Sequence, residues 1–187
     1  MASAITHFIV GSALALPALE SREIRAVLPA WAVLVSAGLL AVAPDLDTFA
    51  MRALSIPYGA FFGHRGFFHS PFFLILAAAM LAALVARRSS RRAAVWLAVL
   101  WAGCALTHPV LDALTDGGSG VMLLFPFSTR RLFFPWRPIR VSPLSIGEFF
   151  ARAGYILRSE LPFSLGAVEI GGTVFCIARA TRRMVGQ

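Results

Sequence analysis

Lysine is absent from this sequence of 187 residues, and all 17 of its basic residues are arginines. Charge is scarce as well: Asp, Glu, Lys and Arg make up only 14% of the chain, whereas an average soluble domain has about 25%. Hydrophobic residues account for 58%, and the mean hydropathy is +0.77. This composition excludes a disordered chain and a coiled coil. It predicts an integral membrane protein, organised as a single domain over residues 1–187.

Cysteine is also scarce. Cys104 and Cys176 lie in separate apolar runs, which excludes a disulfide scaffold and is typical of small buried side chains. The formal net charge of +8 could indicate a nucleic-acid partner. Most of the arginines, however, stand between apolar runs, as they do in the loops of membrane proteins. We therefore expect no nucleic-acid partner.

Five apolar stretches are long enough, or nearly so, to cross a hydrocarbon core that needs about 20 helical residues. They are roughly residues 2–19, 27–43, 71–86, 93–111 and 161–178. The first and the last are the weakest, because they contain His7 and Glu169. The sequence therefore predicts an all-α, polytopic membrane helix bundle of four to five transmembrane helices. A long irregular outer loop is expected at about 112–160. Its aromatic residues favour an interfacial belt, with a short β excursion as a further expectation.

The density of arginines predicts the orientation of these helices. With five crossings, nine arginines fall within about 22 residues on one side, and eight fall within about 76 residues on the other. The dense side is expected to be cytoplasmic, so the N-terminus and both long loops face outward. No arginine precedes Arg22, so the first stretch lacks the basic region of a secretory signal and is expected to be retained.

All four histidines and all four aspartates occur in a few short places along the chain. Under the orientation that arginine alone predicts, each place lies at the outer end of an apolar stretch. Ionisable groups near a bilayer are costly and usually functional, so we expect a shared metal site. Its candidate ligands are His7, Asp45, Asp47, His64, His69, His108 and Asp112.

Local spacing supports such a site. His108 and Asp112 are four residues apart and would share one face of a helix, although Pro109 disfavours helical geometry at His108. Asp45 and Asp47 have a spacing that suits a turn. Each pair taken alone also has a structural explanation, as a hydrogen-bonded pair or as a solvated helix end. His7 alone could be a satisfied polar residue, and His64 alone could contact lipid headgroups.

Ser70, followed by Pro71, predicts a helix N-cap that leaves His69 just outside the helix. A nucleophilic Ser70–His69 pair is disfavoured, because the pattern of a nucleophile elbow is missing and the hydroxyl already has a capping role. Imidazole and carboxylate groups without a usable thiolate favour zinc, with manganese or iron as alternatives. The number of ligands allows one or two ions, and paired ions are common in phosphoester hydrolysis.

This combination of motifs resembles the YdjM-type inner-membrane metal-dependent hydrolases, from residue 7 to about residue 140. The motifs are Thr6-His7, Pro44-Asp45-Leu46-Asp47, His64-Arg65-Gly66 with His69-Ser70, and His108 with Leu111-Asp112 and Thr115. The resemblance implies a multi-pass protein of the inner membrane with a metal-dependent hydrolase activity. The family is distantly similar to zinc-dependent phospholipase C and related nucleases, in which an Asp, a His and a His-x-x-x-Asp pair hold zinc. Asp45 or Asp47, His64 or His69, and His108 with Asp112 would fill those places. The further histidines and the glutamate of those enzymes are missing here.

The function expected from these residues is hydrolysis of a phosphoester or other ester of an amphiphilic, lipid-like substrate. Of Asp45 and Asp47, one would complete the ligand shell and the other would act as general base. Arg65, and also Arg130 or Arg131, could hold a phosphate. The alternatives are a metal-ion transporter and a non-catalytic membrane protein with a structural metal. The oligomeric state stays open.

Overall fold

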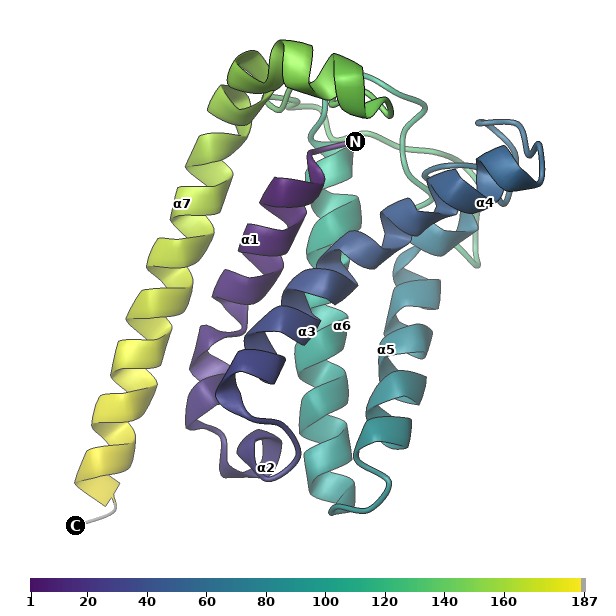
Figure 1. The fold of residues 1–187 in the computed structure, drawn as a ribbon. Coiled ribbons are helices and arrows are strands. Elements are labelled where there is room, and N and C mark those ends of the chain that lie inside the picture. Colours follow the sequence, from purple (N-terminus) through teal and green to yellow (C-terminus); the bar gives the residue numbers. More distant parts are fainter. Residues whose placement is uncertain (186–187) are drawn as a thin grey trace.

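Residues 1–185, which the computed structural model describes, form helices and loops and contain no strand (Figure 1). The helices are α1 (Ala4–Leu14), α2 (Arg22–Arg25), α3 (Ala30–Val42), α4 (Asp47–Ala53), α5 (Pro71–Val85), α6 (Arg91–Ala113) and α7 (Ile146–Val185). Three 3-10 turns join or extend them: η1 (Leu16–Glu20), η2 (Ala43–Leu46) and η3 (Phe67–His69).

The apolar helices confirm the predicted membrane bundle. Three helical stretches are long and apolar enough to cross a membrane, and they cover Ala30–Ala53, Arg91–Ala113 and Gly147–Met184. Two shorter apolar stretches, Ala4–Glu20 and Pro71–Val85, correspond to the first and third predicted segments. All five predicted segments are therefore helical.

The outer loop is shorter than predicted. α7 begins at Ile146, so the irregular part of the loop ends before that residue and the last predicted segment is the continuation of a longer helix. Figure 1 shows that the first part of α7 bends over the end of the bundle before the helix runs down beside α1. Within the loop, the expected β excursion consists of two isolated bridges, Thr115 with Ile139 and Val121 with Leu132.

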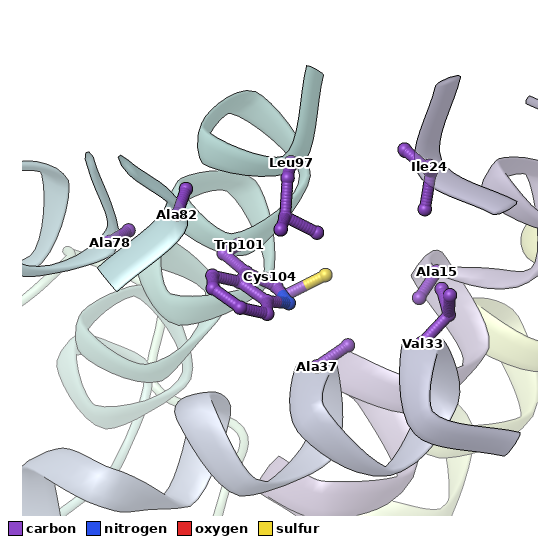
Figure 2. Packing of buried hydrophobic residues seen from close by; sticks show 9 residues of the cluster. All are labelled: Ala15, Ile24, Val33, Ala37, Ala78, Ala82, Leu97, Trp101 and Cys104. Atoms are coloured by element: carbon purple, nitrogen blue, oxygen red, sulfur yellow. The ribbon is translucent and has the colours of Figure 1, made fainter. Parts of the chain in front are cut away.

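α6 lies at the centre of the bundle and packs against α5, α3 and α1. α1 lies between α3 and α7, whereas α5 contacts α6 at the edge of the bundle. The buried cluster in Figure 2 is rich in small side chains, which allow helices to approach closely in a membrane. Within it, the indole of Trp101 donates a hydrogen bond to the hydroxyl of Ser36 on α3, at 3.0 Å.

Gly11 lies at a close approach of α1 and α3. A Cβ atom at this position would lie 2.6 Å from the Cβ of Ala41 and 2.8 Å from the carbonyl oxygen of Ala37. Both distances are too short for a real side chain, so α1 could not pack against α3 in this way with alanine at position 11. The glycine therefore sets the spacing of the two helices one turn away from His7.

The four helices that carry the predicted motifs meet at one end of the bundle. α1 and α5 begin at this end, and α3 and α6 finish there. The predicted start of α5 is confirmed, because the Ser70 hydroxyl accepts a hydrogen bond from the amide of Phe73 at 3.2 Å and Pro71 is the first helical residue. α6 continues through Pro109 to Ala113, so His108 and Asp112 do share a helical face.

Candidate metal centre

Five helical elements and one loop bring the predicted ligands together. α1 carries His7, η2 carries Asp45, and α4 begins with Asp47. The loop before η3 supplies His64 and η3 ends with His69, whereas α6 supplies His108 and Asp112. All seven side chains are buried.

Four of these side chains form the first ligand group, which consists of Asp45, His69, His108 and Asp112. The Nε2 atom of His108 lies 3.4 Å from Oδ1 of Asp45 and 3.6 Å from Oδ2 of Asp112. The Nε2 atom of His69 lies 3.6 and 3.8 Å from the same two oxygens. A tetrahedral zinc site with bonds of about 2.0–2.1 Å has ligand atoms roughly 3.4 Å apart. The four histidine–aspartate separations, 3.4–3.8 Å, are close to that value.

The protein backbone fixes the orientation of His108. Its Nδ1 atom lies 2.7 Å from the carbonyl oxygen of Ala41, and because a carbonyl can only accept, Nδ1 is the donor. Nε2 is then unprotonated in the neutral ring and faces Asp45 and Asp112. A metal-binding histidine is commonly oriented in this way.

Asp47, His64 and His69 form the second ligand group. Oδ1 of Asp47 lies 2.9 Å from Nδ1 of His64, and Oδ2 lies 3.2 Å from Nδ1 of His69. His69 thus belongs to both groups through different nitrogens. A neutral imidazole has one unprotonated nitrogen, so His69 can serve as a neutral ligand in only one group at a time.

His7 extends the first group. Its ring stacks on that of His108, with centroids 3.8 Å apart, and its Nε2 atom lies 3.6 Å from Oδ1 of Asp112. The arrangement places a third imidazole beside the same carboxylate. His7 is therefore near enough to add a ligand to the first group.

Arg65 lies behind Asp112 and is completely buried. Its Nε atom is 3.1 Å from Oδ2 of Asp112, and its two terminal nitrogens donate to the Gly117 carbonyl at 2.9 Å and the Thr115 hydroxyl at 2.8 Å. Its backbone has φ +62°, in the left-handed region that a non-glycine residue rarely adopts. All three nitrogens of the guanidinium therefore contact other groups of the protein.

The other two candidate phosphate-binding arginines occupy different surroundings. Arg131 donates to the carbonyl oxygens of His64 and Ala60, at 2.6 and 2.7 Å, and so braces the loop that carries His64. Arg130 is exposed. Within residues 1–185, neither side chain forms an ion pair with a carboxylate of the ligand groups.

The strongest feature of this region is a shortage of hydrogen-bond partners. Among residues 1–185, eleven buried side-chain nitrogen or oxygen atoms lack a hydrogen bond, and all eleven belong to this cluster. They are contributed by His7, Asp45, Asp47, His64, Arg65, His69, His108 and Asp112. Buried polar groups without partners are costly, and a cation would satisfy the carboxylate oxygens and imidazole nitrogens together. The cluster could therefore hold a metal ion.

Comparisons with known proteins agree with this architecture. The family model described as "YdjM inner membrane protein" matches residues 1–184. The chain belongs to the YdjM inner membrane protein family. It is also 35% identical over 124 residues to "Inner membrane protein YbcI" of Escherichia coli (strain K12), a match that covers 66% of this chain and 70% of that protein. No solved structure matches. Neither the family nor the relative has a name that states an activity.

A buried acid that the sequence analysis missed holds α1 of this YdjM-family protein in place. Glu160 on α7 is completely buried and accepts hydrogen bonds from the Ser3 amide, the Ser3 hydroxyl and the Thr6 hydroxyl. The amide of Ala2 also donates to Oδ1 of Asp112, at 2.8 Å. Glu160 thereby fixes the start of the helix that carries His7. An isolated acid beside the last apolar run was the one signal that could have identified it.

The two histidines outside the spanning helices differ in their protonation. Burial tends to lower the pKa of His69, but the carboxylates of Asp45 and Asp47 outweigh this effect and raise its pKa to about 9. Burial also lowers the pKa of His64, and there the effect of burial prevails. At neutral pH and without a cation, His69 is therefore the protonated histidine of the pair.

This difference predicts that zinc affinity rises with pH. A cation binds neutral imidazole, so the proton on His69 must leave below its pKa of about 9. We expect the dissociation constant for zinc to fall about tenfold per pH unit between about pH 6 and 8, as one proton is released. Competition titrations against a chelator of known pH dependence would measure it. An affinity that is constant over this range would contradict the displacement of a proton from His69.

Proposed function

We propose that this protein is a membrane-bound, metal-dependent hydrolase that cleaves a phosphoester or other ester of an amphiphilic substrate. The observation that carries the proposal is the set of ten buried carboxylate and imidazole atoms without a hydrogen-bond partner, which surround a group of four ligands that could hold one ion. Zinc fits the two imidazoles and two carboxylates best, with manganese and iron as alternatives, and one or two ions are proposed. When bound, such an ion would polarise the scissile bond and lower the pKa of a water molecule.

The residues of the chain divide the remaining work. Asp45, His69, His108 and Asp112 hold the ion, and His7 is a further ligand. Asp47 aligns the rings of His64 and His69 and is proposed as the general base that accepts a proton. Arg65 keeps Asp112 in position, and its predicted role in holding a phosphate stays a prediction. The site is proposed to face the non-cytoplasmic side, because it lies at the end of the bundle where the arginines are less dense along the chain.

An apolar cavity beside Asp47 supports an amphiphilic substrate. Its volume is about 350 Å³, and it lies between α3, η2 and α4 on one side and α5 on the other. Its lining residues are Leu40, Ala43, Pro44, Leu46, Asp47, Ala50, Phe68, Phe73, Leu74, Ala77, Ala78 and Ala105. Because α3 and α5 are apolar membrane helices, a hydrocarbon chain could enter from the bilayer while its ester group reaches Asp47.

Filling this cavity tests both the activity and the substrate class. We would assay the zinc-loaded protein in detergent with bis(p-nitrophenyl) phosphate, which is soluble, and with a long-chain phosphatidylglycerol. Ala77→Leu is expected to slow cleavage of the lipid about tenfold or more, because the added methyl groups occupy the cavity. Cleavage of the soluble ester should change little.

Ala79→Leu is the matched control, because Ala79 lies on the same helix, is exposed and is not among the lining residues. It should leave both reactions unchanged. Equal loss with both substrates in Ala77→Leu would contradict the role of the cavity. If the folded, zinc-loaded protein cleaves neither ester, the hydrolase proposal itself is wrong.

Burial of all seven candidate ligands favours a structural ion as the second candidate function, because structural metal sites are closed. In that case chelation would unfold the protein and no ester would be cleaved. A transporter is less well supported: transport sites usually lie near the middle of the bilayer, and these ligands lie at one end of the bundle. Measured zinc flux into proteoliposomes would support the transporter instead.

A further inference from the structure

A polar hollow lies at the opposite end of the bundle from the metal centre. It has a volume of about 770 Å³ and is bordered by η1, α2, the start of α3 and the C-terminal part of α7 (Figure 1). Its lining residues are Leu19, Glu20, Arg22, Arg25, Ala30, Phe175, Arg179, Arg182 and Arg183. Five arginines and one glutamate give the lining a formal charge of +4.

Most of this charge has no partner within the described part of the chain. Arg182 donates to the carbonyl oxygen of Glu20 at 3.0 Å and lies 3.4 Å from its carboxylate. Within residues 1–185, no carboxylate forms an ion pair with Arg22, Arg25 or Arg179. Guanidinium groups from two distant segments therefore share one hollow with a single acid. Their mutual repulsion would be relieved by a bound anion.

The general excess of arginine in the cytoplasmic loops of membrane proteins does not by itself explain why five arginines line this hollow. Arg87 and Arg88 lie in the loop between α5 and α6, at the same end of the bundle, and both are exposed. They add positive charge to that end without lining the hollow. A rule about loop charge accounts for the total number of arginines but not for five of them around one space.

We propose that this hollow binds the phosphate of an anionic phospholipid headgroup. Arginine presents paired donors that match phosphate oxygens, and clusters of arginine bind anionic lipids. The apolar side chains of Leu19, Ala30 and Phe175 complete the lining, and α3 and α7, which are long and apolar enough to cross a membrane, border the hollow. A lipid would therefore place its headgroup among the arginines and its chains along the outer face of α7. Free phosphate shares the charged chemistry but makes no use of the apolar side chains.

Native mass spectrometry of the detergent-purified protein tests this site. The protein would be titrated with phosphatidylglycerol, with phosphatidylcholine of the same chain length, and with inorganic phosphate. We expect tight binding of phosphatidylglycerol only. In the Arg22→Gln/Arg179→Gln variant its affinity should fall about 25-fold, since each arginine near an anionic lipid contributes about a factor of five. All four arginines used in the variant and its control are exposed, so both proteins should fold.

The control is Arg87→Gln/Arg88→Gln, which removes the same charge from the same end of the bundle. It should bind phosphatidylglycerol within about twofold of the unchanged protein, because neither arginine lines the hollow. Equal losses in the two variants would overturn the proposal in favour of general attraction. Equal affinity for phosphatidylcholine, or tighter binding of inorganic phosphate than of phosphatidylglycerol, would also overturn it. A phosphatidylglycerol molecule in the cavity beside Asp47 would bind equally to both variants, so the difference between the two variants reports the hollow alone and does not depend on the hydrolase proposal.

Discussion

Bound zinc is expected to disappear when His108 and Asp112 are both replaced by alanine. These residues supply two of the four ligand atoms of the first group, and both lie on the last turns of α6. Removing half of the ligands should weaken zinc binding by about 10³-fold or more. Elemental mass spectrometry of the purified protein, reported as ions per chain, would measure the loss. The unchanged protein should carry one or two ions.

Two further variants make this experiment decisive. Cys104→Ala alters a buried residue one turn before His108 on the same helix, outside both ligand groups, and should keep its zinc. Loss of Asp112 also leaves the guanidinium of Arg65 without its carboxylate, which could unfold the double variant. His69→Gln preserves that ion pair and should still lower zinc affinity about 100-fold or more. Full zinc content in a folded His69→Gln protein would contradict the site.

Asp47→Asn is expected to retain zinc at saturating concentrations and to lose most of its turnover. The asparagine has nearly the same shape but cannot accept a proton, so the rate of ester cleavage should fall about 100-fold or more. The measurement is kcat for bis(p-nitrophenyl) phosphate at saturating zinc, with ion content determined on the same sample. Circular dichroism and gel filtration would confirm that the fold is kept.

Asp116→Asn is the matched control for that change. Asp116 lies close to the cluster in sequence, but its carboxylate pairs with Arg140 at 2.8 Å and belongs to neither ligand group. Its turnover should stay within about twofold of the unchanged protein. If Asp47→Asn cleaves the ester at the full rate, Asp47 is not the base and Asp45 becomes the remaining aspartate for that role.

The membrane helices could be predicted because each of them contains a long run of apolar residues in the sequence. The sequence also predicted the start of α5, because Ser70 and Pro71 form a local signal that depends on no distant contact. The first part of α7 was wrongly assigned to the loop. Arg152, Arg158 and Gly154 interrupt its apolar pattern, and the helix lies at the end of the bundle where it need not be apolar.

Predicting the site required only the positions of residues relative to the helix ends. The structure brings the seven candidate ligands to one end of the bundle, and that placement follows from alternating helix directions. The pairing of Asp47 with two histidines depends on how the start of α4 approaches η3 and the loop before it, which no local pattern encodes. The hydrogen bond from His108 to the Ala41 carbonyl depends in the same way on the packing of α3 against α6. Glu160 was missed for this reason too.

The glycine at position 11 has a consequence for the dimensions of the centre. His7 precedes it by one helical turn, and Ala41, which a Cβ atom at position 11 would meet, provides the carbonyl oxygen that orients His108. A single methyl group at position 11 would push α1 outward and separate the stacked rings of His7 and His108. A glycine without a functional group therefore sets the distance between the helices that carry the ligands of the metal centre. Substitutions on the lipid-facing side of α1 should therefore have little effect on the metal centre, whereas substitution of Gly11 should disrupt it.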